Sequence, residues 1–288
     1  MRKSETLRDG STTLDSTAHH MNPISSRLAT RLGLVALDGR RHPEPPALVV
    51  VAHGSRDPRT LRTVHTLLDQ VRELRPGLPV RLGHIELNAP LLPDTLASLG
   101  TGDAVLVPLL LSRGYHVKRD IPEMAAAAPA RTRVAAPLGP HPLLVDALYD
   151  RLVEAGWRTP VDEATRRTSA VVLAAAGSRD PDAAADTGRT AHLLAERLGV
   201  PVIPAYASAA KPTIETAVRA LAARGRHRVA VASYFTAPGL FATQCADKAP
   251  WIASAPLATH PALARLLLHR YDQSLATQTI PEPALASA

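Results

Sequence analysis

The chain has 288 residues, 45% of them hydrophobic, and a formal net charge of +7. No apolar run approaches the ~20 residues needed to span a bilayer, so we expect no membrane binding. The basic residues are mostly arginines scattered along the chain, and only 3% of all residues are aromatic, so we expect no nucleic-acid binding. The charged, hydroxyl-rich residues 1–20 do not resemble a signal peptide, and a lone Cys245 excludes an internal disulfide, so we expect a cytoplasmic protein.

The first part of the chain changes character at Ala47. Residues 1–46 are rich in Ser, Thr, Arg and Pro, and we expect a disordered tail. Beyond it, apolar runs such as VLVPLLL at 105–111 are typical of parallel strands covered on both faces. The sequence predicts strands over 47–53, 79–86, 103–110 and 131–136, helices over 58–75, 90–99, 120–128 and 141–155, and a polar loop over 111–119. Right-handed crossovers then give a doubly wound α/β unit.

A second series of elements follows a linker at 156–168. The predicted strands are 169–175, 201–207, 227–234 and 252–256, the predicted helices are 181–198, 211–224, 241–249 and 260–274, and a C-terminal tail occupies 276–288. Three pairs of segments align the two series: GSRDP with GSRDP, LPV with VPV, and PLGPHP with PLATHP, at offsets between 119 and 123 residues. The chain is therefore an internal duplication, with two tandem α/β domains at 47–155 and 169–275.

The duplication separates structural residues from candidate functional ones. Ser55 and Asp57 recur in the second copy, and Ser and Asp before a proline satisfy the free amides of a helix start, so we favour a structural role for both. His141 and His260, each followed by Pro, are interpreted as helix-entry residues for the same reason.

Three polar residues of the first copy are lost in the second. His53, Glu86 and His116 lie at or just beyond the carboxyl ends of successive predicted strands, where ligands bind in open parallel sheets. Their counterparts are Ala176, Ser208 and Phe241 in the second copy, none of which is suited to carry a proton or bind a metal. Two imidazoles and a carboxylate suit a divalent ion such as Fe²⁺, Co²⁺, Ni²⁺ or Zn²⁺, and equally a general-base cluster.

The predicted loop after the third strand also loses its positive charge in the second copy. Arg113, Lys118 and Arg119 have uncharged counterparts there. Cations would repel a bare metal ion, but they suit a ligand that carries several carboxylates. A solvated loop with ordinary charges is the other interpretation.

Three segments resemble the CbiX/SirB class of sirohydrochlorin chelatases: VAHGSRDP at 51–58, IELNAP at 85–90 and VPLLLSRGYHVKRDIP at 107–122. The resemblance covers about residues 47–275, with a degenerate second half, and implies two flavodoxin-like, chelatase-type domains. It implies insertion of a divalent metal into sirohydrochlorin, a tetrapyrrole with eight carboxylates, without a nucleotide.

The resemblance also assigns the site. His53 and His116 match the two active-site histidines of the family, and Glu86 matches the position of their acidic partner, so these three are the catalytic and metal-binding candidates. Arg113, Lys118 and Arg119, together with Ser55 and Arg56, become the candidate contacts to substrate carboxylates.

The resemblance further implies that the second half serves as a built-in partner, so we expect a monomer with an intramolecular pseudo-dimer. Iron, for siroheme, is the favoured metal because the chain has no histidine-rich tract, and cobalt, for cobalamin, is the alternative. A non-catalytic metal or tetrapyrrole carrier is the alternative of another class. A hydrolase or phosphatase is disfavoured, because GxSxG, Walker and dinucleotide-binding motifs are absent from the sequence.

Overall fold

The computed structural model describes residues 44–160 and 162–277, and from Pro45 onward the chain forms one compact unit. The predicted tails at 1–46 and 276–288 therefore lie almost wholly outside the described residues. Within the described residues, no helix has the length and apolar character to cross a membrane.

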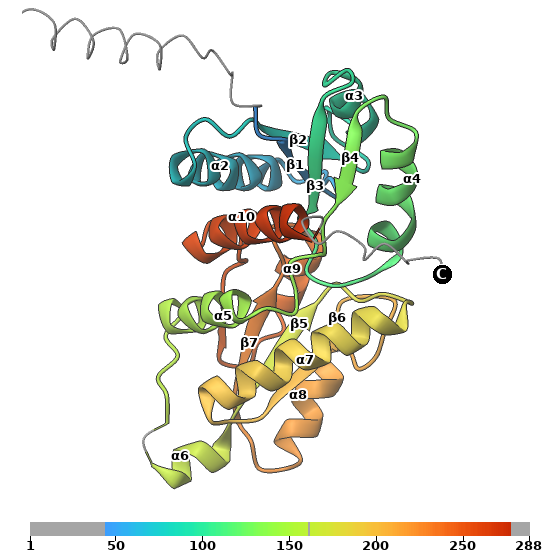
Figure 1. Ribbon diagram of the computed structural model, residues 1–288. Helices are drawn as coiled ribbons and strands as arrows, with labels where there is room; N and C mark the ends of the chain where they lie inside the picture. Colours follow the sequence, from blue (N-terminus) through green and yellow to red (C-terminus); the bar gives the residue numbers. More distant parts are fainter. Residues whose placement is uncertain (1–43, 161, 278–288) are drawn as a thin grey trace, which may run out of the picture. The chain divides into compact units, whose positions relative to one another are not determined.

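The first repeat forms a four-stranded parallel sheet with the order β2-β1-β3-β4 (Figure 1). Its strands are β1 (Ala47–Ala52), β2 (Val80–His84), β3 (Asp103–Pro108) and β4 (Arg131–Val134). Its helical segments are α2 (Pro58–Leu74), α3 (Leu92–Ala97), the π-helical turn η1 (His116–Asp120), α4 (Ile121–Ala126) and α5 (Pro142–Glu154). The sequence-based prediction of a doubly wound parallel α/β unit is confirmed.

The second repeat has the same arrangement, with the sheet order β6-β5-β7-β8 and every pair parallel. Its strands are β5 (Ser169–Ala175), β6 (Val202–Tyr206), β7 (Arg228–Tyr234) and β8 (Ile252–Ala253). Its helices are α7 (Pro181–Leu198), α8 (Ile214–Ala222), α9 (Leu240–Ala246) and α10 (Pro261–Ala276). A further short helix, α6 (Glu163–Thr168), lies in the segment predicted to be a linker.

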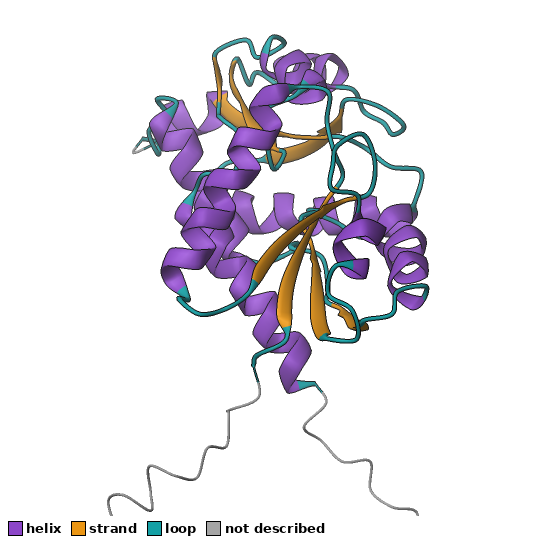
Figure 2. Cartoon of the chain, turned by 90° about the horizontal axis from the view of Figure 1, so that it is seen from above, coloured by secondary structure: helices purple, strands orange, loops and turns teal. Residues whose placement is uncertain are grey.

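The central strand of each sheet is buried on both faces. Every residue of β1 (ALVVVA) and of β5 (SAVVLAA) is buried, and helices flank both sheets in Figure 2. A strand covered on both sides has no solvent-facing row, which is why its sequence is a continuous apolar run without alternation.

Four of the long helices begin with side-chain caps that the duplication indicated. Asp57 accepts a hydrogen bond from the amide of Arg59 at the start of α2, and Asp180 does the same at the start of α7. His141 and His260 accept amide hydrogen bonds at the starts of α5 and α10, so their interpretation as helix-entry residues is confirmed.

The last helix of each repeat packs on the other repeat. Helix α5 contacts α7 and β7, whereas α10 contacts α2 and β3, and the two helices also contact each other (Figure 1). Polar contacts follow the same exchange: the Tyr271 hydroxyl donates to the carbonyl of Pro46, and Arg75 forms a bidentate ion pair with Asp272. One hydrophobic core therefore includes side chains of both sheets. The predicted boundaries at residues 155 and 275 mark the ends of the sequence repeats. They do not mark separate packing units, because the two repeats share this core.

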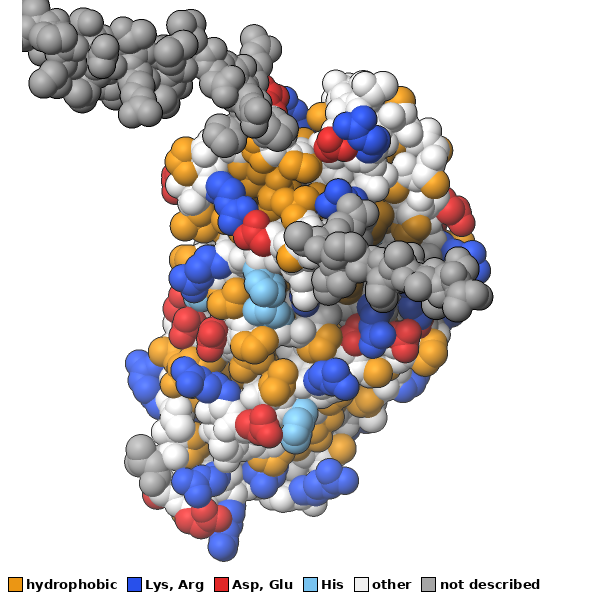
Figure 3. All heavy atoms as spheres, in the orientation of Figure 1, with side chains coloured by type: hydrophobic (Ala, Val, Ile, Leu, Met, Phe, Trp, Pro, Cys, Tyr) orange, Lys and Arg blue, Asp and Glu red, His pale blue; other side chains and the backbone are white. Residues whose placement is uncertain are grey.

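Charged side chains of both signs are interspersed on the surface. On the face drawn in Figure 3, Lys and Arg lie scattered with Asp and Glu between them. The net charge of +7 is thus not gathered into one patch on that face.

Candidate functional site

The three predicted site residues follow the carboxyl ends of adjacent strands. His53 comes directly after β1, Glu86 lies two residues beyond β2, and His116 is the first residue of η1, which follows β3. Because β1 lies between β2 and β3 in the sheet, the topology brings all three to one edge.

A tight turn at Gly54 brings the segment that carries His53 against the segment that carries Glu86. Gly54 has φ +104°, and a Cβ there would lie 1.9 Å from the carbonyl oxygen of Glu86. The Glu86 amide donates to the carbonyl of His53 (3.0 Å), and the Ser55 amide donates to Asn88 Oδ1 (2.6 Å). Only glycine tolerates both the left-handed conformation and this close approach.

The second repeat keeps this turn without the functional side chains. Gly177 has φ +94°, and a Cβ there would lie 1.9 Å from the carbonyl oxygen of Ser208. The Ser208 amide donates to the carbonyl of Ala176. The GSRDP turn is therefore a scaffold that persists where the imidazole and the carboxylate are lost.

His53 lies next to both of the other predicted site residues. Its ring centroid is 4.7 Å from that of His116, and the two rings are nearly perpendicular at 86°. His53 Nδ1 is also 3.5 Å from Glu86 Oε1. The structure thus brings His53 close to each of the other two side chains.

Each imidazole has a carboxylate beside its Nδ1 atom. His116 Nδ1 contacts Oδ2 of Asp120 one helical turn later, and His53 Nδ1 lies 3.3 Å from the carbonyl oxygen of Gly54 and 3.5 Å from Oε1 of Glu86. Across the described residues, neither Nε2 atom has a hydrogen-bond partner in the protein. A carboxylate behind a histidine fixes the ring and leaves the other nitrogen free for a metal or a proton.

Asp120 is a residue that sequence reasoning missed. Its signal is the spacing in HVKRD, which places His116 and Asp120 one turn apart on a helical segment. The sequence predicts a polar loop over 111–119, and a loop gives no reason to pair these positions. In the structure η1 begins at His116 and continues into α4, so the pair shares one face.

Among the described residues, no three His, Cys, Asp or Glu side chains are arranged so that they could together hold a metal ion. Glu86 sits beside Nδ1 of His53 and is half-exposed, which suits a carboxylate that orients the imidazole. The two Nε2 atoms are the ligand atoms that the arrangement offers most directly.

The histidines open into a cavity of about 910 Å³. The second repeat forms much of its lining, which sequence reasoning did not predict. Its contribution includes the turn at 177–181, both phenylalanines (Phe235 and Phe241), Tyr206 and Tyr234. This volume is at the upper end of the range for small-molecule sites, so a large ligand fits.

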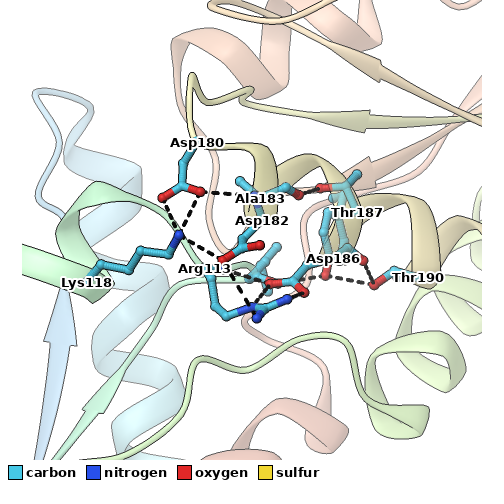
Figure 4. A network of polar contacts seen from close by, with 10 residues as sticks. Arg113, Lys118, Asp180, Asp182, Ala183, Asp186, Thr187 and Thr190 are labelled. Carbon is cyan, nitrogen blue, oxygen red and sulfur yellow. Dashed lines mark hydrogen bonds and ion pairs between the residues drawn. The ribbon is translucent and has the colours of Figure 1, made fainter.

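Two of the predicted substrate contacts are engaged within the protein instead. Arg113 donates to Asp186 through both its backbone amide (2.9 Å) and its guanidinium (2.9 and 2.7 Å), as Figure 4 shows. Lys118 lies 2.7 Å from Asp180 and 2.8 Å from Asp182, and these hydrogen bonds raise the pKa of its ammonium. The structure thus gives Arg113 and Lys118 partners on α7 and its cap, in place of the expected substrate carboxylates.

The remaining predicted contacts differ from one another. Ser55 Oγ accepts a hydrogen bond from the Asp57 amide (3.1 Å), as Ser178 does from Asp180, which is the favoured structural role. Arg56 and Arg119 are exposed, and neither forms an ion pair with any described residue.

The chain is similar in sequence to proteins of a known family. The family model CbiX matches residues 47–155 and again 170–274. The sirohydrochlorin cobaltochelatase of Methanopyrus kandleri is 30% identical over 137 residues, covering 38% of this chain and 96% of the relative. The sirohydrochlorin ferrochelatase of Bacillus subtilis is 31% identical over 176 residues, covering 58% of this chain and 64% of the relative.

A solved structure shares the fold. "SirB from Bacillus subtilis with Fe3+" has a TM-score of 0.67 at 24% identity, over 81% of this chain and 96% of that one. Both repeats match the family model, and together the matches span most of the chain. The chain belongs to the CbiX family.

Proposed function

We propose that this protein is a sirohydrochlorin chelatase, a lyase that inserts a divalent metal into sirohydrochlorin without a nucleotide. The observation that carries the proposal is the perpendicular pair of His53 and His116 at a cavity of about 910 Å³, each ring with a carboxylate beside its Nδ1. The names of the two curated relatives support it, since both are sirohydrochlorin chelatases.

Metal insertion requires a group that can bind the ion or accept a proton, and a neutral imidazole can do either. A divalent ion replaces two pyrrole N–H protons, so one ion enters and two protons leave. A free imidazole nitrogen can bind the ion or accept a proton, and both imidazoles line the same cavity here. His53 and His116 are the proposed groups for both tasks. Glu86 and Asp120 would hold the rings and stabilise positive charge on them.

The peripheral carboxylates of the substrate need cations. Arg56 and Arg119 remain the proposed contacts from the first repeat, because both are exposed and lack an ion-pair partner among the described residues. Guanidinium groups suit this use, since they pair bidentately with carboxylates.

We favour Fe²⁺ as the physiological metal and keep Co²⁺ as the alternative, since the relatives' names include both metals. Imidazole ligands do not by themselves separate the two ions. We further propose that the protein acts as a monomer, because the second repeat already supplies much of the cavity lining. A cytoplasmic location is proposed from the sequence, as argued above for residues 1–20 and the lone Cys245.

The test is metal insertion by wild-type protein and by H116A, followed through the absorbance of sirohydrochlorin on adding Fe²⁺ or Co²⁺. We expect H116A to lose insertion while its circular dichroism spectrum stays native. His192→Ala is the matched control, because His192 is exposed on α7, where it pairs with Glu196. Full activity of H116A would remove the assignment.

A carrier protein predicts a different stoichiometry. With protein at one-hundredth of the substrate concentration, a chelatase converts all the sirohydrochlorin, whereas a carrier changes at most an equal amount. A no-protein sample gives the spontaneous rate. Conversion that stops at one equivalent would favour the carrier.

A further inference from the structure

Aromatic rings are concentrated at the cavity. The chain has two Phe and five Tyr in 288 residues, and both Phe and three of the Tyr line this one cavity. Because only 3% of the residues in the chain are aromatic, a random distribution would not place five of them at one cavity.

Core packing explains only part of this concentration. Tyr234 is buried, and its hydroxyl donates to the carbonyl of Leu111 and contacts Thr190, so it is a structural residue. Phe241, in contrast, is 40% exposed and Tyr115 is 65% exposed. Exposed rings lose stabilisation that burial would provide, which suggests that they serve a ligand.

Phe241 also marks where the repeats diverged. It is the counterpart of His116, since each follows the third strand of its own sheet and stands at the start of the next helical segment. His116 and Phe241 line the same cavity. Where the first repeat has an imidazole, the second thus contributes an apolar ring to the cavity that the histidines line.

The second repeat also brings a cation to the cavity. Arg179 lines it, is exposed, and forms no ion pair with any described residue. Lys118, another cation of the lining, is held by Asp180 and Asp182. Within the described residues, Arg179 is therefore a cation at this cavity that is free to pair with an anionic ligand.

We propose that the second repeat is the substrate-holding half of the site: Phe241 contacts the face of the tetrapyrrole, and Arg179 pairs with one of its peripheral carboxylates. This inference rests on the proposed function and assigns the substrate contacts within it. A tetrapyrrole is flat and conjugated with a charged rim, and aromatic rings beside a guanidinium match that pattern. The first repeat then carries the metal and proton chemistry, while the second orients the ring.

The test separates tetrapyrrole binding from metal binding. Metal-free sirohydrochlorin is titrated into wild-type protein, F241A and R179Q, with its absorbance or fluorescence as readout. We expect F241A to raise the Kd about tenfold, as for one lost ring contact, and R179Q to raise it about threefold, as for one exposed ion pair. KM should rise with Kd, while kcat at saturating substrate changes little.

Two controls make the result specific. Leu240→Ala changes the neighbouring side chain, which is 68% exposed and is not part of the cavity lining, and it should leave the Kd unchanged. Titration with Co²⁺ alone, read from its visible absorption, should give the same affinity in F241A, R179Q and wild type.

The outcomes distinguish the two proposals. Wild-type Kd in both F241A and R179Q, with turnover intact, would overturn the substrate-holding role and leave the chelatase proposal standing. A wild-type protein that neither binds nor metallates sirohydrochlorin would overturn both. A rise in Kd for F241A and R179Q but not for Leu240→Ala supports the inference.

Discussion

Arg113 of the first repeat and Asp186 of the second are joined by three hydrogen bonds, one from the Arg113 backbone amide and two from its guanidinium. Burial alone would raise the pKa of Asp186, but the hydrogen bonds and charge of Arg113 outweigh it and hold the pKa below its ordinary value. Arg113 lies three residues before His116, so this contact fixes the segment that carries the imidazole to the opposite half of the molecule (Figure 4).

Asp186→Asn should therefore lower stability and disturb the site. The change leaves Arg113 without its anionic partner, and because Arg113 is about half exposed we expect a loss of about 1–2 kcal/mol in the free energy of unfolding. Urea unfolding measures it. The control is Glu215→Gln, which breaks the exposed pair with Lys248 and should cost less than about 1 kcal/mol. Equal losses in both variants would contradict a special role for Asp186.

The pH dependence of that loss follows from the sign of the shift. A carboxyl whose pKa is lower in the folded state contributes stability above its unfolded pKa, and this contribution disappears as the pH falls through the folded pKa. The difference between wild type and Asp186→Asn should therefore be full at neutral pH. It should shrink below about pH 4, the ordinary range of an aspartate.

The exchanged helices predict that neither repeat is stable alone. Leu263, Leu266 and Leu267 of α10 are fully buried in a core that includes the first repeat, and each would lose about 1.5–3 kcal/mol of burial without it. Fragments 1–160 and 161–288 should each lack a cooperative unfolding transition. Mixed together, they should regain one, as measured by circular dichroism. A native transition in either separate fragment would show that the exchange is not needed for folding.

The elements of the fold were predictable because their causes are local. Buried parallel strands give continuous apolar runs, and caps such as Asp57 and His141 precede a proline at the helix start. The predicted strand 252–256 shortens to the two residues of β8, and the predicted linker contains α6, because neither segment has a strong local signal.

The candidate site was predictable only where the second repeat served as a control. His53, Glu86 and His116 differed between the copies, and the structure places them together. The exchange of α5 and α10 left no local trace, because either sheet could bury either helix.

The ion-pair partners of Arg113 and Lys118 could not be predicted from the sequence either. They depend on a contact between α7 and the loop after β3, which no single repeat contains. The aromatic cavity lining escaped for the same reason, since it forms only when the two repeats face each other.

Asp120→Ala should weaken the metal site while leaving the protein folded. Asp120 contacts Nδ1 of His116, and removal of a carboxylate behind a ligating histidine lowers metal affinity or activity about 10- to 100-fold. Co²⁺ titration of the metal-binding affinity and the rate of metal insertion measure the effect. Glu123→Ala, on the following turn, is the control and should keep both values. Unchanged Co²⁺ affinity in Asp120→Ala would mean that the carboxylate does not support a ligand.

His141 predicts a separate pH dependence that comes from the scaffold. Burial, together with the nearby Arg270 and His269, lowers the pKa of His141 to about 4, and its Nδ1 accepts the Leu143 amide at the start of α5. A histidine that stays neutral when folded gives stability above its unfolded pKa of about 6.5, and this stability is lost as the pH falls toward about 4.

The variant that tests this is His141→Asn, which can still accept the amide hydrogen bond at the helix start but does not titrate. Between pH 6.5 and 4, its free energy of unfolding should fall less steeply than that of wild type, as measured by urea unfolding at a series of pH values. His192→Ala removes an exposed histidine and should keep the wild-type slope. If His141→Asn and wild type lose stability in parallel over this range, protons are taken up elsewhere on unfolding and His141 is not their site.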